Sequence, residues 1–123
     1  MKAFEFRDYY EKITIAGNIF DIDTSTDAGD KVRSHTLEEK DVASEIAKGV
    51  KTKLDLLAKF KSDIDDVLEV GAFEKIFEQR KPTVSDASDI MLYIVGFMVE
   101  CNTQRKSERS ISDKQEIHIE KDE

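Results

Sequence analysis

Between residues 12 and 23 the chain reads Lys-Ile-Thr-Ile-Ala-Gly-Asn-Ile-Phe-Asp-Ile-Asp, in which polar and apolar residues alternate on both sides of a Gly-Asn dipeptide. This pattern predicts a β-hairpin with Gly17 and Asn18 as its two-residue loop. In that register the facing pairs are Ile15 with Phe20, Ile13 with Ile22, and Lys12 with Asp23. A two-stranded hairpin is marginally stable alone and has two unpaired edges. It therefore needs a helix beneath it or strands from another subunit.

After Asp23 the apolar residues recur at three- and four-residue steps, which predicts α-helix from about residue 30 to residue 101. We expect one long helix that ends at Gly71, with a kink or break near residues 60–63. A short helix should follow from Ala72 to Arg80. Beyond Pro82 we expect a closing helix whose apolar stripe is Ile90, Met91, Ile94, Phe97, Met98 and Cys101. The predicted fold class is mainly α: an N-terminal β-hairpin (12–23) followed by a small helical bundle.

The composition of the 123-residue chain changes near Cys101. All ten aromatic residues precede this position, and residues 102–123 are charged and polar with few large apolar side chains. We therefore predict a single compact domain over residues 1–101 and a disordered tail over residues 102–123.

Charge and hydropathy exclude several classes of partner. The net charge of −8 opposes binding to nucleic acid, which requires clustered Lys and Arg. The longest apolar stretch, residues 90–99, is about half of the roughly 20 residues that a membrane span needs. A single cysteine and the lack of an apolar leader at the N-terminus favour the reducing cytoplasm, where we expect the protein to act.

No motif in the sequence predicts an enzyme. The run that starts at Asp21 resembles the opening of a calcium loop, but it has Thr26 where Gly is needed and Val32 where Glu is needed. The two histidines, His35 and His118, are far apart in the chain, and Cys101 falls on an apolar helix stripe. The glycines are dispersed, so no phosphate-binding loop is present. We expect no catalytic residue, no metal and no cofactor.

Several features are typical of a protein that binds other proteins. Basic residues between Lys48 and Lys61 are followed by acidic residues between Asp63 and Glu69. This run is either the solvated flank of a helix or a pair of patches that complement a second copy head to tail. Phe4 and Phe6 either add a third strand or form an arm. The candidate interaction residues are Phe4, Phe6, Tyr9, Tyr10, Ile13, Ile15, Phe20, Ile22, Lys59, Lys61, Asp65 and Asp66.

The order of the predicted elements, together with Asp65, Asp66, Val67, Gly71, Ala72, Lys75, Ile76 and Phe77, resembles the tail assembly chaperones of long-tailed phages and prophages of Gram-positive bacteria. The resemblance covers roughly residues 12–100. The chain departs from the family pattern at Gly71, where Gly-Ala-Phe is shorter than the expected Gly-x-Gly-x-x form.

This resemblance implies a non-enzymatic protein that self-associates into a ring or spiral, coats the tape-measure protein and helps to recruit tail-tube subunits. The alternative prediction is a small acidic, phage-encoded binding or regulatory module that occupies the surface of a host protein. Ordered, concentration-dependent oligomers would indicate the first function, and a discrete monomer or dimer the second.

Overall fold

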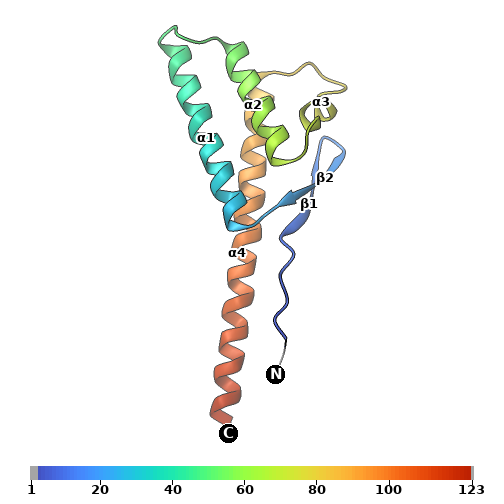
Figure 1. Ribbon diagram of the computed structural model, residues 1–123, viewed down its shortest axis with the longest axis vertical. Coiled ribbons are helices and arrows are strands. Elements are labelled where there is room, and N and C mark those ends of the chain that lie inside the picture. Colours follow the sequence, from blue (N-terminus) through green and yellow to red (C-terminus); the bar gives the residue numbers. More distant parts are fainter. Residues whose placement is uncertain (1–2, 123) are drawn as a thin grey trace.

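The computed structural model describes the backbone of residues 3–122 and the side chains of residues 3–107. Its elements are β1 (Tyr10–Ile15), β2 (Asn18–Asp23), α1 (Thr26–Ala47), α2 (Lys53–Val67), α3 (Ala72–Ile76) and α4 (Val84–Asp122). Figure 1 shows α1 and α2 as an antiparallel pair that lies along the first half of α4, while the hairpin and α3 occupy the other side of α2. The predicted fold class, mainly helical with an N-terminal hairpin, is confirmed.

The loop of the hairpin lies one residue earlier than predicted. Ala16 and Gly17 form the loop, with φ angles of 50° and 79°, as a type I′ turn requires at both central positions. Asn18 instead begins β2, where its side-chain amide donates to the carbonyl oxygens of Ala16 and Lys75. The predicted pairs are therefore wrong: Ile13 faces Phe20, and Lys12 faces Asp21.

The buried face of the hairpin is nevertheless the predicted one, because the two registers differ by an even number of residues and leave each side chain on the same side. Four hairpin side chains are at most 6% exposed and belong to the hydrophobic core: Ile13, Ile15, Phe20 and Ile22. The hairpin therefore packs within its own subunit. Residues 3–9 add no third strand.

The helical hairpin breaks at residues 48–52, and not near residues 60–63 as predicted. Gly49 has a φ of 77°, a left-handed conformation that ends α1. Thr52 then caps α2 through a capping box with Asp55. The predicted break does not occur there, since α2 continues through residues 60–63 with Phe60 and Ile64 on its buried side.

The core lies where α1, α2 and α4 meet the hairpin and α3. The stripe of α4 contributes Ala87, Met91, Ile94 and Met98, each at most 3% exposed. The other end of the core is covered by Phe73, Ile76 and Phe77. The turn before them is held by Asp65, which accepts a hydrogen bond from the Phe73 N–H at 2.9 Å. The methionines Met91 and Met98 thus form core together with Ile94, while the other residues of the predicted stripe, Ile90, Phe97 and Cys101, are half-buried.

The last helix does not end at the predicted domain boundary. It runs past Cys101, and Arg105 reaches back to the carbonyl oxygen of Thr24 at 2.9 Å. Residues 102–107 therefore belong to the folded unit, because they hold a contact with the segment between β2 and α1. The backbone continues α4 as far as Asp122. The side chains of residues 108–123 lie outside the described part of the chain, so whether this tail belongs to the compact domain stays a prediction.

Candidate functional site

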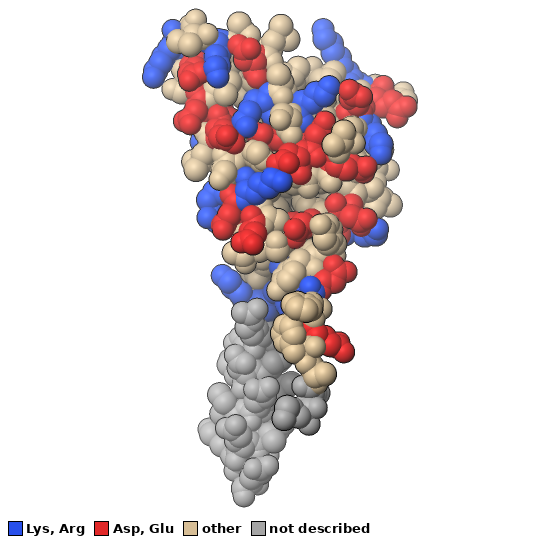
Figure 2. Space-filling model, viewed as in Figure 1, with Lys and Arg blue, Asp and Glu red and all other residues tan. Residues whose placement is uncertain are grey.

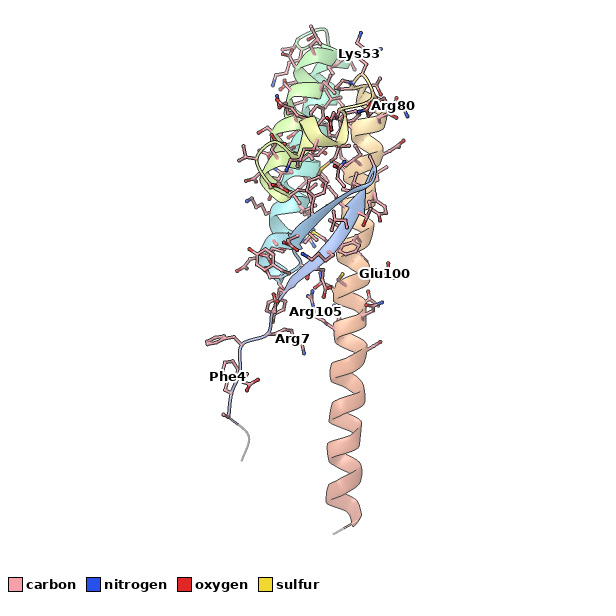
Figure 3. The ribbon with its side chains drawn as sticks, turned by 90° about the vertical axis from the view of Figure 1, so that its right-hand side faces the viewer. Phe4, Arg7, Lys53, Arg80, Glu100 and Arg105 are labelled. Carbon is pink, nitrogen blue, oxygen red and sulfur yellow. The ribbon has the colours of Figure 1, made fainter. Side chains whose placement is uncertain are left out.

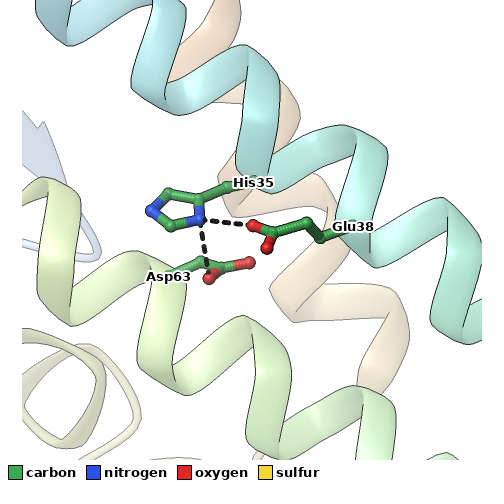
Figure 4. Close-up of side chains that lie close together, drawn as sticks. All are labelled: His35, Glu38 and Asp63. Carbon is green, nitrogen blue, oxygen red and sulfur yellow. Dashed lines mark hydrogen bonds and ion pairs between the residues drawn. The ribbon is translucent and has the colours of Figure 1, made fainter.

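A polar cluster lies between α1 and α2 (Figure 4). His35, Glu38 and Glu39 are three and four residues apart on α1, so one side of that helix presents all three to α2. Lys59, Asp63 and Asp66 are spaced in the same way on α2. The antiparallel packing of the two helices brings both sets together.

His35 lies at the centre of this cluster. Its Nδ1 is 3.1 Å from Glu38 Oε1 and 3.0 Å from Asp63 Oδ1, and its Nε2 is 2.7 Å from Asp66 Oδ2. A histidine that faces carboxylates on both ring nitrogens donates to both only when each nitrogen carries a proton. His35 thus links Glu38 of its own helix to Asp63 and Asp66 of α2.

The cluster has the side chains of a metal site, but it already contains a cation. Ligand atoms of His35, Glu38 and Asp63 lie within 4.8 Å of one another. However, Lys59 Nζ lies 3.1 Å from Glu38 Oε1 and 2.9 Å from Asp63 Oδ1, the two carboxylate oxygens that a metal would need. A bound ion would have to displace this ammonium group, so the residues do not fit a metal centre.

The electrostatics of the cluster follow from these contacts. The hydrogen bond from Lys59 lowers the pKa of Glu38, and the hydrogen bond from His35 lowers the pKa of Asp66. Burial alone would lower the pKa of Lys59, but its bonds to Asp63 and Glu38 raise it overall. The cluster is thus a compensated ion-pair network, which fixes how α1 and α2 pack.

Glu39 is the exception in this network. It is 7% exposed, and burial together with its contact with Asp63 raises its pKa to about 9. One oxygen each of Glu39 and Asp63 has no hydrogen-bond partner. A proton on Glu39 satisfies both atoms, because the neutral acid can donate to the Asp63 carboxylate. Glu39 is therefore uncharged at neutral pH.

The charged residues that we proposed for contacts between subunits have partners within the chain. Lys59 and Asp66 belong to the polar cluster, Lys61 bonds Glu74 at 3.1 Å, and Asp65 holds the turn before α3. On the face shown in Figure 2, acidic and basic side chains are interspersed over the helices. Their arrangement favours the solvated-flank interpretation of the charge run.

The aromatic candidates fall into two groups. Phe4 and Phe6 are 81% and 92% exposed, and their rings meet edge to face with centroids 5.0 Å apart. Tyr9 and Tyr10 are nearer the body, where the guanidinium of Arg105 lies 4.9 Å from the centre of the Tyr9 ring. Figure 3 shows residues 3–8, the N-terminal arm, extending away from the helices below this contact.

An apolar stripe lies on the solvent side of α4, opposite its core side. It consists of Leu92, Gly96 and Val99, with Tyr93 beside them. Leu92, Tyr93 and Val99 are 66%, 52% and 59% exposed. Positions 92, 96 and 99 follow the i, i+4, i+7 spacing of one helix face. We call these four residues the α4 stripe.

Next to this stripe is an apolar groove of about 230 Å³ between α1, α2 and the start of α4. Its lining includes Leu56, Phe60, Met91, Ala43, Leu92 and Lys40. Glu39 also borders the groove, and because it is uncharged it leaves the wall largely apolar. We call this feature the helix groove.

Neither the polar cluster nor the α4 stripe was predicted from the sequence. His35, Glu38 and Glu39 form a His-x-x-Glu-Glu run, and Asp63 and Asp66 an Asp-x-x-Asp run, so the spacing was visible. Pairing the two runs requires the break at Gly49, which we placed elsewhere. Cys101, on the predicted stripe of α4, is half-buried, and burial raises the pKa of its thiol.

No protein-family model, curated protein or solved structure matches the chain. Within the described residues, no helix is both long enough and apolar enough to cross a membrane.

Proposed function

We propose that the protein is a non-enzymatic assembly chaperone that self-associates and coats a long helical client, in the manner of the phage tail assembly chaperones that its sequence resembles. The client in that role is the tape-measure protein, and the assembled chaperone would help to recruit tail-tube subunits in the host cytoplasm. The α4 stripe is the observation that carries this proposal.

The stripe suits a helical partner for two physical reasons. A helix that is apolar on both its sides needs a partner on each side, and the core supplies only one of them. In addition, a Cβ atom added at Gly96 would meet no atom within 4 Å, so the backbone of a second helix can approach closely there. A long amphipathic client offers many such helix faces in series, and repeated weak contacts give high avidity.

The experiment that tests this proposal measures binding of a purified helical tape-measure fragment to the full chain by calorimetry. We expect the wild type to bind and Val99→Glu to lose at least about tenfold in affinity, because a charge on the stripe would have to be desolvated. Val70→Glu is the matched control, since Val70 is 93% exposed and lies outside the stripe. A wild-type chain that ignores the fragment, or equal binding by Val99→Glu, would refute the proposal.

The alternative function, an acidic module that binds a basic host surface, has one observation in its favour. A hollow of about 350 Å³ beside Tyr10 has four aspartates in its wall and one lysine, Lys31, which pairs with Asp66 at 3.0 Å. The aspartates are Asp21, Asp23, Asp27 and Asp66. This module would be a fixed monomer or dimer at all concentrations. Its binding would weaken with salt, because exposed charges are screened.

A further inference from the structure

The N-terminal arm presents two large apolar side chains that its own subunit does not cover. Phe4 and Phe6 lie on the same side of an extended segment, with their rings in contact and both more than four-fifths exposed. Tyr9 is fixed where the arm begins, since its carbonyl oxygen accepts the Thr24 N–H at 2.9 Å and its ring lies against Arg105. The arm is thus an apolar ligand on a fixed base.

The helix groove has the matching properties. A cavity of about 150 Å³ is large enough to bind benzene, so the groove of about 230 Å³ can admit a phenyl ring. Its floor is Leu56, Phe60 and Met91, and exposed Leu92 extends the apolar surface at the rim. One ring of the arm can enter the groove while the other packs on Leu92.

The N-terminal arm points away from the groove of its own subunit. Figure 1 shows it leaving the hairpin toward the C-terminal end of α4, whereas the groove lies between α1, α2 and the start of α4. Met91, at the groove, lies fourteen residues before Arg105, at the base of the arm, or roughly 20 Å along the helix axis at 1.5 Å per residue. To fill the groove of its own subunit the arm would have to reverse its direction and run almost fully extended along the body. A second molecule can place the same segment in the groove without this rearrangement.

We propose that the N-terminal arm of one subunit docks into the helix groove of a second copy of the chain. The charges do not oppose this occupant: Lys40 stands exposed on the groove wall, and Glu5 lies on the side of the extended arm opposite the two phenylalanines, away from the apolar floor. Glu39, the other ionisable group of the wall, is uncharged at neutral pH and does not repel Glu5. This inference rests on the proposed function, because it identifies the contact by which the chaperone self-associates.

The contact is heterologous, because arm and groove are different surfaces at opposite ends of the folded body. Each subunit has one arm and one groove, so the contacts can repeat and build an open array or a closed ring. A single docked arm buries little area, so assembly is expected to depend steeply on protein concentration.

The experiment uses two full-length variants, each of which lacks one half of the contact. Phe4→Ser with Phe6→Ser removes the apolar ligand, and Ala43→Glu places a charge in the groove wall. Both changes are at exposed positions, and Ala47→Glu, one turn further on the same helix, is the matched control. Molar mass is measured by light scattering behind size exclusion over a wide concentration range, and circular dichroism checks the fold.

The expected result has three parts. The wild type and Ala47→Glu form assemblies that grow with concentration, each half-contact variant stays monomeric, and a 1:1 mixture of the two variants forms dimers and nothing larger. A monomeric wild type, variants that assemble like the wild type, or a mixture that stays monomeric would overturn the inference.

Binding of the client fragment is measured on the monomeric variants separately. If the monomeric variants bind the fragment, the contact between arm and groove is separate from client binding. If the wild type is itself monomeric and loses fragment binding when Phe4 and Phe6 are replaced, the arm binds the client and the inference is wrong.

Discussion

At Glu39, burial and a neighbouring acid decide the charge of a single residue. The side chain sits one turn after His35 on α1 and against Asp63 of α2, with Lys59 and Glu38 as the next charged groups. Burial is the largest cause of its raised pKa, which reaches about 9 from an ordinary value of 4.5. Folding therefore retains a proton on Glu39 that the unfolded chain releases.

This difference predicts a loss of stability as the pH rises. Above pH 4.5 the unfolded state binds fewer protons at this position than the folded state, so the free energy of unfolding falls until the pH reaches about 9. The slope from one proton is at most about 1.4 kcal/mol per pH unit. We expect Glu39→Gln, which keeps a donor for Asp63, to lose this slope between pH 5 and pH 9. Urea unfolding at several pH values measures it, and parallel profiles for both proteins would contradict the assignment.

A second window of pH dependence lies on the acid side and has the opposite sign. The pKa values of Glu38 and Asp66 are lowered, so their contribution is present above the ordinary carboxyl range and is lost as the pH falls through the lowered values. The two effects therefore act on opposite sides of about pH 4.5. The slope assigned to Glu39 can be measured without interference from these exposed carboxylates.

At the scale of elements, alternation and helical spacing were enough to predict which segments are strand and which are helix. The hairpin face, the short segment after Gly71 and the α4 core stripe all follow from period alone. The exact position of the loop does not follow from the pattern. Ala16 has a positive φ, which a residue with a Cβ atom disfavours, and no sequence rule places alanine there. Likewise, the spacing of Ser62 and Asp65 equals that of the Thr52–Asp55 capping box, so spacing alone does not decide where the helix breaks.

The two glycines at positions 49 and 96 give a matched test of the helix boundary. A Cβ atom at either position meets open space, so only the backbone conformation distinguishes them. Gly49→Ala places a side chain at a φ of 77° and should destabilise the fold by about 1–2 kcal/mol. Gly96→Ala lies inside α4 and should stabilise it by about 0.5–1 kcal/mol. Urea unfolding measures both, and the same sign for the two changes would show that the break is not set by Gly49.

At the scale of the whole molecule, three distant segments meet at one guanidinium. Arg105 donates to the Thr24 carbonyl oxygen and hydroxyl and to Asn102 Oδ1, and it lies over the Tyr9 ring. Thr24 is fully buried. The contact joins the base of the N-terminal arm, the β2–α1 connection and α4. The composition predicted a boundary at Cys101 because residues 102–107 are polar. A polar residue can still belong to the folded unit when it donates to buried oxygen atoms, as Arg105 does.

Removing this contact should therefore destabilise the folded body and release the arm. Arg105→Met keeps the apolar stem but leaves the buried oxygens of Thr24 without their donor, which should cost about 2 kcal/mol. Ending the chain after Cys101 should cost at least as much, whereas ending it after Ser107 should leave the free energy of unfolding unchanged, because the contacts of Arg105 are kept. Urea unfolding compares the three proteins with the full chain. Hydrogen exchange at the Thr24 amide, which donates to the Tyr9 carbonyl oxygen, should quicken where Arg105 is lost, because the guanidinium contacts both residues. Equal stability of the chains ending at Cys101 and Ser107 would return the boundary to Cys101.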